Sequence, residues 1–234
     1  MMDQQIEKLQ DLINESKFTL VITGAGISVA SGIASMHGLN MADTFQFAST
    51  IVLKATPEHY YRVSRRSFLD AIFNNGPSFA HKKMAELEKK GKLQGVITTN
   101  IDGLHSPAGS KNVAEIQGSF HVNKCLSCGK RNDDICIWNQ GKAPRCNCGG
   151  LMCSFPVYAH VGVLEEEVSK SRNWAGNAEL VIIVGAIGNY SSVYFNYINP
   201  SAKIVQINPA KTQFDSLAEI NIHKTADAVF EKIS

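Results

Sequence analysis

Four short apolar runs recur along the chain and constrain its fold more than any other feature. Residues 18–23 read FTLVIT, and similar runs occupy residues 95–98, 180–184 and 203–207. A continuous apolar run of this length is typical of a parallel strand that is buried on both faces. Helical patterns such as residues 78–90 separate the runs. The alternation predicts an α/β fold with a Rossmann-like, doubly wound parallel sheet.

Two segments lack this pattern, and we interpret them as insertions. Residues 35–74 are helical or loop-like without a strand signal, and residues 124–153 are polar and rich in Gly and Cys. We therefore expect a nucleotide-binding domain formed by residues 1–34, 75–123 and 154–234. The helical insertion and the cysteine-bound module would together form a small domain, with a cleft between the two domains.

The composition excludes several classes of protein. The 23 basic and 21 acidic residues give a formal charge of +2 and are spread along the chain, without the clustered basic excess of a nucleic-acid footprint. The amino-terminal sequence is charged and amphipathic, unlike a secretory signal, and no apolar run approaches the roughly 20 residues of a membrane span. We therefore expect a cytoplasmic protein that binds neither nucleic acid nor a membrane.

The cysteines form a pattern with metal-ligand spacing. Cys125 and Cys128 form a CxxC pair, and Cys146 and Cys148 form a CxC pair after 17 intervening residues. Disulfides are not expected in a reducing compartment, whereas two short knuckles that supply four thiolates resemble a zinc ribbon. Because the second pair is one residue shorter than usual, Cys153 could replace one of its members. We predict a structural zinc ion bound by Cys125, Cys128, Cys146 and Cys148; a metal-free, reduced module is the alternative.

A glycine-rich turn follows the first apolar run. Residues 24–28 read GAGIS and lead toward a predicted helix. Backbone N–H groups in such a turn can approach a pyrophosphate that also meets the positive end of the helix dipole. The alternative is an ordinary tight turn that needs glycine for a positive φ. The spacing is not GxGxxG, so the standard dehydrogenase fingerprint is absent.

Polar residues follow the later runs. The second run ends in TTNIDGLH, residues 98–105. Ligands of open α/β sheets bind outside the carboxyl ends of the strands, so we predict that Asn100 and Asp102 contact a ligand. The alternative is an Asx turn that caps the next helix. The third run ends at Gly185 and the fourth at Asn208, and four such strand ends together predict one extended ligand.

Taken together, GAGIS, TTNIDGLH, the QGS before the first cysteine pair, and INPAKT at residues 207–212 resemble the sirtuins. This is the Sir2 family of NAD-dependent protein deacylases and ADP-ribosyltransferases. The resemblance covers nearly the whole chain and implies NAD and zinc as cofactors and a protein as substrate. It implies cofactor-binding roles for Gly24, Ala25, Gly26, Ser28, Thr99, Gly185 and Asn208. It implies roles at the reacting centre for Asn100, Asp102 and Gln117.

The sequence departs from the sirtuin pattern at several motifs. Residues 32–38 read GIASMHG where deacylating sirtuins usually read GIPDFRG, and Thr99 stands where they have Gln. Residues 185–187 read GAI in place of GTS, which removes two hydroxyl groups. Residues 155–160 do not match the Phe-Gly-Glu that lines the acyl-lysine groove. These differences would alter recognition of an acetyl-lysine peptide.

The most consequential departure is Gln117, which stands where sirtuins usually have a histidine that takes a proton from the NAD ribose. A carboxamide forms hydrogen bonds but cannot take up that proton, and loss of a general base typically costs about 10²- to 10⁴-fold in rate. Cleavage of the nicotinamide bond needs charge stabilisation, which Asp102 could still supply. A macrodomain-linked branch of sirtuins that also has Gln at this position looks like a group of protein ADP-ribosyltransferases. His105 and His121 are candidate substitute bases, although a lone histidine is more often a core or capping residue.

We therefore expect a sirtuin-type enzyme that cleaves NAD and transfers ADP-ribose to a protein side chain or a small nucleophile. NAD-dependent protein-lysine deacylation is the alternative. A module that binds NAD without turnover is the third hypothesis. The sequence does not specify the acceptor or the acyl group, and it leaves open an accessory protein partner that completes the pocket.

Overall fold

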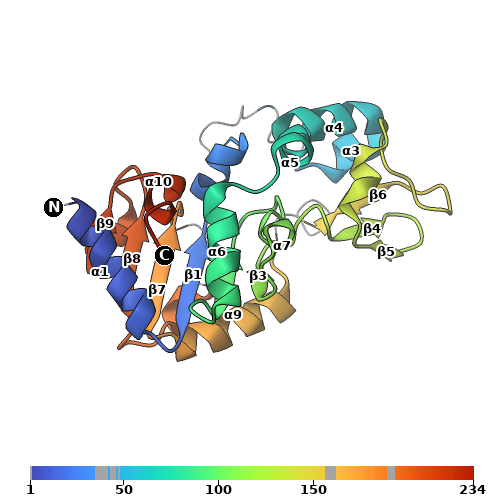
Figure 1. The fold of residues 1–234 in the computed structure, drawn as a ribbon. Coiled ribbons are helices and arrows are strands. Elements are labelled where there is room, and N and C mark those ends of the chain that lie inside the picture. The colour runs from blue at the N-terminus through green and yellow to red at the C-terminus, as the bar shows by residue number, and fades with distance from the viewer. Residues whose placement is uncertain (1, 35–41, 43–45, 47, 156–161, 189–192) are drawn as a thin grey trace.

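The computed structural model describes the whole chain apart from a few short segments, which are residues 1, 35–41, 43–45, 47, 156–161 and 189–192. The sequence departures at residues 35–38 and 156–160 therefore lie outside the described residues. Figure 1 shows a sheet domain on one side and a smaller group of helices and short strands on the other. Within the described ranges, no helix is both long and apolar enough to cross a membrane.

Six parallel strands form the main sheet, in the order β3-β2-β1-β7-β8-β9. They are β1 (Thr19–Thr23), β2 (Gly95–Thr98), β3 (Val113–Glu115), β7 (Leu180–Val184), β8 (Lys203–Ile207) and β9 (Ile220–Ile222). This order is that of the two-halved dinucleotide-binding sheet, in which the topological switch point lies between the first and fourth strands. The predicted Rossmann-like sheet is confirmed, and the two strands that no apolar run predicted, β3 and β9, are its edges.

Helices cover both faces of this sheet. The helices on one face are α1 (Met2–Glu15), α6 (Phe79–Lys89) and α10 (Ala226–Phe230). The opposite face packs against α9 (Glu165–Asn177). Shorter helices connect these elements: η1 (Ala25–Ser31), α7 (His105–Ala108), η5 (Phe195–Tyr197) and η6 (Gln213–Ser216). Burial on both faces explains why every residue of β1, β2 and β7 is buried.

Side-chain caps fix the start of α6. The Ser78 hydroxyl accepts a hydrogen bond from the backbone N–H of His81, and the Ser78 N–H donates to His81 Nδ1. The Ala80 N–H donates to Asp227 Oδ1 at 2.9 Å, so the first turn of α6 is bonded to α10. The bonds from the His81 and Ala80 N–H groups satisfy donors that the first turn of a helix leaves without an intrahelical partner.

The two insertions share one hydrophobic core. The helical insertion contains α3 (Thr50–Ala55), α4 (Pro57–Ser64), the π-helical η2 (Arg65–Leu69) and α5 (Asp70–Asn75). The cysteine module contains β4 (Asn123–Cys125), β5 (Arg131–Asn132), β6 (Met152–Ser154) and the 3-10 helix η3 (Ile135–Asn139). Trp138 is fully buried between Tyr60 and Phe120, and its indole N–H donates to Asn123 Oδ1 at 2.9 Å. The exact domain boundaries stay a prediction, but these contacts join the insertions into one unit.

The loops that follow β1 and β7 are packed backbone to backbone. The N–H of Gly26 donates to the carbonyl of Gly185 at 2.9 Å. A Cβ on Gly26 would lie 2.6 Å from Gly185 Cα, and a Cβ on Gly24 would lie 2.7 Å from Ala186 Cα. Gly185 also has a φ of 60°, which L side chains rarely adopt. The glycines are therefore needed for this close approach at the switch point.

We expect Gly185→Ala to lower the free energy of unfolding by about 3 kcal/mol, because it adds a backbone clash to the strain of a positive φ. Gly91→Ala is the matched control, since Gly91 has a φ of 71° and nothing within 4 Å of its added Cβ. The control should lose only about 1 kcal/mol. Urea unfolding compares the two variants, and equal losses would show that the loop contact is not tight.

Candidate functional site

Three predicted residues form a hydrogen-bonded cluster where β1 and β2 end. The Ser28 hydroxyl donates to Asp102 Oδ2 at 2.7 Å, and Asp102 Oδ1 accepts from the Leu104 N–H at 3.0 Å. The amide of Asn100 donates to the Gly24 carbonyl at 3.1 Å and to Ser28 Oγ at 3.2 Å. Ser28, Asn100 and Asp102 are all buried. Both Asn100 N–H groups have partners, so its carbonyl oxygen is the atom it offers to a ligand.

A second group of predicted residues lies across the switch point. Asn208, directly after β8, donates from Nδ2 to the Ala186 carbonyl at 3.2 Å and accepts from the Ala210 N–H at 3.2 Å. Gly185 and Ala186 pack against Gly24 and Gly26, as described above. The structure therefore brings the predicted residues from β1, β2, β7 and β8 to one edge of the sheet. Thr99 lies at the same edge, and its N–H donates to the Thr23 carbonyl.

The segment after Gly24 differs from the prediction in one respect. It is a 3-10 helix of seven residues, η1, and no side chain caps its start at Gly24. A short 3-10 helix has a smaller dipole and poorer hydrogen-bond geometry than a long α-helix. The helix-dipole contribution to phosphate binding is therefore smaller than the sequence suggested.

Gln117 lies in the turn that follows β3, at the same edge of the sheet. It is buried, and the turn is closed by the Gly118 N–H, which donates to the Glu115 carbonyl at 2.9 Å. Gly118 has a φ of 61° and lies against the Phe155 ring. Within the described part of the chain, no hydrogen bond joins the Gln117 amide to Asn100 or Asp102. The amide lies at the same edge of the sheet and does not belong to the hydrogen-bonded cluster.

A row of polar residues crosses three strand ends on the α6 face of the sheet. Thr23, Thr98 and Glu115 are register partners on β1, β2 and β3, so their side chains point to the same face. Thr23 Oγ1 lies 3.0 Å from His105 Nε2, and the His105 ring lies 4.6 Å from the His81 ring. The row therefore continues into the helices α7 and α6. None of the three register partners was among the predicted site residues.

Three histidines lie in this region, and burial lowers the pKa of each. His105 is buried, and burial lowers its pKa well below the usual range, with the neighbouring His81 acting in the same direction. Burial likewise lowers the pKa of His81. His121 is half-buried with its ring against Gly103, and partial burial lowers its pKa as well. His105 is thus a core side chain bonded to Thr23, and it does not have the exposure that a substitute base would need.

Glu115 is the other titratable side chain of the edge. Ser119 Oγ donates to its carboxylate Oε2 at 2.8 Å. Burial raises the pKa of Glu115 to about 7, and the charges of Asp102 and Glu167 act in the same direction, while the Ser119 bond and Lys170 oppose them. Glu115 is half-buried, and a carboxyl group that titrates near neutral pH is characteristic of functional sites. No sequence pattern indicated this residue, because Glu115 precedes the motif and lies on an unpredicted strand.

The raised pKa makes stability depend on pH with a definite sign. The pKa of Glu115 rises from an ordinary 4.5 to about 7 on folding, so the stability from its protonated form is lost as pH rises toward 7. Between pH 5.5 and 8.5 the wild-type protein should lose about 2 kcal/mol through this group. Glu115→Gln cannot ionise and should not show that loss. Urea unfolding at both pH values, with Glu7→Gln as the exposed-carboxyl control, tests this; equal pH dependence in Glu115→Gln and wild type would contradict it.

The four predicted cysteines converge at one point of the small domain. The sulfur atoms of Cys125, Cys128, Cys146 and Cys148 all lie within 4.8 Å of one another. Two of the separations are 3.6 and 3.7 Å. Zn–S bonds of about 2.3 Å in a tetrahedron place the sulfur atoms about 3.8 Å apart, so the donor set fits zinc. Cys153 is buried in the small-domain core, and its thiol donates to the Ser154 carbonyl instead.

The zinc content of variants distinguishes the four predicted ligands from the alternative set, in which Cys153 replaces one member of the second pair. We expect Cys148→Ser to lose bound zinc and to unfold at lower temperature, because three thiolates remain for an ion that stabilises the module. Cys153→Ala should keep its zinc, and so should Cys136→Ser, an exposed-cysteine control. Elemental analysis of the purified variants measures this. Zinc that survives in Cys148→Ser but is lost from Cys153→Ala would assign Cys153 as the ligand.

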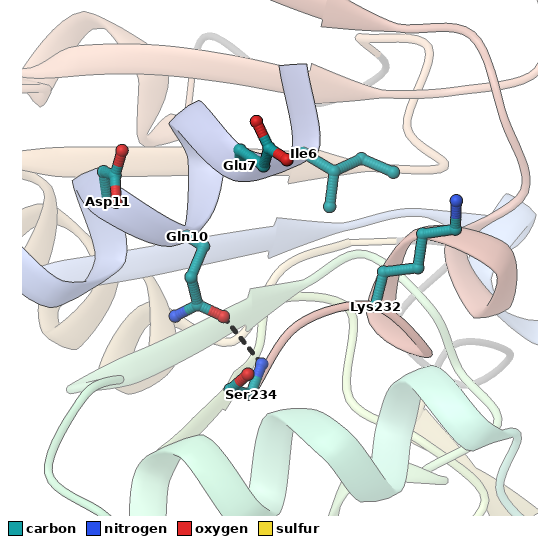
Figure 2. A pocket seen from close by; sticks show the side chains of 6 residues that line it. All are labelled: Ile6, Glu7, Gln10, Asp11, Lys232 and Ser234. Atoms are coloured by element: carbon teal, nitrogen blue, oxygen red, sulfur yellow. Dashed lines mark hydrogen bonds between the residues drawn. The ribbon is translucent and has the colours of Figure 1, made fainter. Parts of the chain in front are cut away.

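Two surface cavities lie apart from this edge. Figure 2 shows one of about 350 Å³, between α1 and the last residues of the chain, lined by Ile6, Glu7, Gln10, Asp11, Lys232 and Ser234. Another of about 200 Å³ adjoins Leu180 and Lys203, the first residues of β7 and β8. None of the predicted site residues lines either cavity. The site is therefore identified by its buried polar cluster and by the strand order, and not by the size of a cavity.

The chain is similar to known proteins over most of its length. The model of the Sir2 family matches residues 24–191. An NAD-dependent protein deacetylase of Sulfurisphaera tokodaii is 32% identical over 239 residues, covering 95% of this chain and 92% of the relative. One of Clostridium perfringens is 32% identical over 247 residues, covering 99% of each chain. A solved structure described as Sir2-p53 peptide-NAD+ superposes with a TM-score of 0.81 at 29% identity, covering 97% of this chain and 96% of that one.

Proposed function

This chain belongs to the Sir2 family, and from that premise we propose that it is an NAD-dependent protein-lysine deacylase. The observation that carries the proposal is the buried Ser28–Asn100–Asp102 cluster at the carboxyl edge of a dinucleotide-binding sheet. The names of the curated relatives support deacylation over ADP-ribosyl transfer, which the sequence alone favoured. A cytoplasmic location belongs to the same proposal.

The chain's own residues supply what cleavage of the nicotinamide–ribose bond requires. That cleavage develops positive charge at the ribose carbon, and the Asp102 carboxylate is held in place by Ser28 and by the Leu104 N–H. A preorganised charge of this kind needs no reorganisation when the positive charge develops. Asn100 offers its carbonyl oxygen to the ribose or the carboxamide. On the far side of the switch point, Asn208 and the Gly185 loop would hold the adenosine half.

ADP-ribosyl transfer is the second candidate, and Gln117 favours it. After the nicotinamide leaves, an acceptor nucleophile needs only to reach the ribose carbon, whereas deacylation also needs a group that takes a proton from a ribose hydroxyl. Gln117 cannot take that proton. Deacylation therefore requires that another residue provide the base, whereas ADP-ribosyl transfer does not.

The products distinguish the two candidates. With NAD and an acetyl-lysine peptide, we expect free nicotinamide, deacetylated peptide and O-acetyl-ADP-ribose in a mass spectrum. Asp102→Asn should lower nicotinamide release by about 10²- to 10³-fold, because the charge opposite the ribose is lost. Asp133→Asn, an exposed carboxylate of the cysteine module, is the matched control and should react like wild type.

Other outcomes have equally definite meanings. An ADP-ribosylated protein or peptide in place of O-acetyl-ADP-ribose would replace the first proposal with the second. Nicotinamide at background level in every mixture would reject both and leave an NAD-binding module. Gln117→His should raise deacetylation if the base is the limiting group, by at most the roughly 10²- to 10⁴-fold that a general base contributes.

A further inference from the structure

We propose that the core of the small domain positions the Asp102 carboxylate, and that Leu104 is the positioning residue through which this core acts. The inference rests on the proposed function, because it concerns cleavage of the nicotinamide–ribose bond. Deacylation and ADP-ribosyl transfer share that cleavage, so the inference applies to either reaction. Leu104 acts on Asp102 through its backbone N–H and is assigned no contact with the reacting atoms.

The two oxygen atoms of Asp102 are held from different domains. Asp102 Oδ2 accepts from Ser28 Oγ at 2.7 Å, and Ser28 follows Ile27, which is buried in the core of the sheet domain. Asp102 Oδ1 accepts from the Leu104 N–H at 3.0 Å. The Leu104 side chain is 1% exposed and is buried in the core of the small domain. The carboxylate therefore has one hydrogen bond from each side, and its orientation depends on both.

The loop that carries Asp102 alternates between the two domains. The side chains of Asn100 and Asp102 bond to residues 24–28 of the sheet domain. The side chains of Ile101 and Leu104 pack in the small-domain core, which is built from the helical and cysteine insertions. Neither domain alone therefore fixes the conformation of this loop.

A backbone contact joins the same loop to the small-domain core. The Phe120 N–H donates to the Ile101 carbonyl at 3.1 Å. The buried Phe120 ring lies edge to face with the Trp138 ring at 5.7 Å and 6.0 Å from the Phe68 ring. Phe68 belongs to the helical insertion and Trp138 to the cysteine module. The loop is thus connected to both insertions, at a point between Asn100 and Asp102.

Truncation of Leu104 should affect bond cleavage more than NAD binding. A shorter side chain leaves a void into which the loop can relax, and the N–H that holds Asp102 Oδ1 then loses its fixed position. A preorganised charge acts only if it faces the carbon at which positive charge develops, and a misplacement of about 1 Å can cost about 10²-fold in rate. The glycine contacts at the switch point and the bond from Asn208 to Ala186 do not involve Leu104, so the adenosine half should bind normally.

Leu104→Ala and Leu53→Ala form a matched pair for the test. Leu53 lies on α3 and is fully buried in the same core, so thermal unfolding should show similar losses of stability in both variants. With NAD and an acetyl-lysine peptide, Leu104→Ala should lower kcat for nicotinamide release at least about tenfold and change the KM for NAD less than about twofold. Leu53→Ala should keep both constants within about twofold of wild type. Leu104→Met, which conserves volume, should restore kcat.

Hydrogen exchange tests the anchoring without NAD or a peptide. The protection factor of the residue 104 amide should fall at least about tenfold in Leu104→Ala and stay at the wild-type level in Leu53→Ala, because only the first variant frees the donor to Asp102. If Leu104→Ala does not fold, Leu104→Val and Leu53→Val make the same comparison with a smaller truncation.

Either of two results would overturn the inference. Equal losses of kcat in the Leu104 and Leu53 variants would show that the core acts only through overall stability. Unchanged protection of the residue 104 amide in Leu104→Ala would show that the side chain does not position this donor. The absence of nicotinamide release in wild type would reject the proposed function, and hydrogen exchange would still decide the anchoring, so the two failures are distinguishable.

Discussion

The close backbone contact between the loops after β1 and β7 is the constraint on which the rest of the site depends. The two strands are neighbours, and the chain leaves them toward opposite sides of the sheet, so their loops begin side by side at the switch point. Glycines at positions 24, 26 and 185 allow an approach that a single Cβ would block. This contact fixes the Gly24 carbonyl, which holds Asn100, and the Ala186 carbonyl, which holds Asn208. Residues from both halves of the sheet are thereby placed by one backbone geometry.

In the small domain, side-chain contacts join two segments that are distant in the sequence. The helical and cysteine insertions are separated by about 50 residues of the sheet domain, yet neither could bury enough apolar surface alone. Trp138 packs against Tyr60, and Arg65 of the helical insertion bonds Asn139 of the cysteine module. A metal held by the four thiolates would fix the loops that carry the cysteine pairs, while the shared core around Trp138 holds the two insertions together. A metal ion at this site would have a structural role and no part in the reaction, because its four protein ligands leave no coordination position for a substrate.

The sequence predicted the features that local pattern controls. The apolar runs correspond to β1, β2, β7 and β8, because buried parallel strands need continuous apolar residues. The edge strands β3 and β9 have three residues each, which is too short for a pattern to stand out. Asn100 and Asp102 could be predicted because they follow directly after an apolar run, and ligands bind at the carboxyl ends of such strands. Ser119 and Glu115 were missed because their pairing depends on a turn closed by Gly118, which only the tertiary structure shows.

The contrast between Gln117 and Glu115 bears on which reaction the site performs. Replacing a histidine by an amide removes a base, but it does not by itself remove the need for one. The half-buried Glu115 carboxyl, with a pKa of about 7, costs stability above neutral pH, and the chain could avoid that cost with Gln at position 115. Deacylation needs a proton acceptor in its second step and ADP-ribosyl transfer does not, so the reaction depends on whether another group supplies the base that Gln117 cannot.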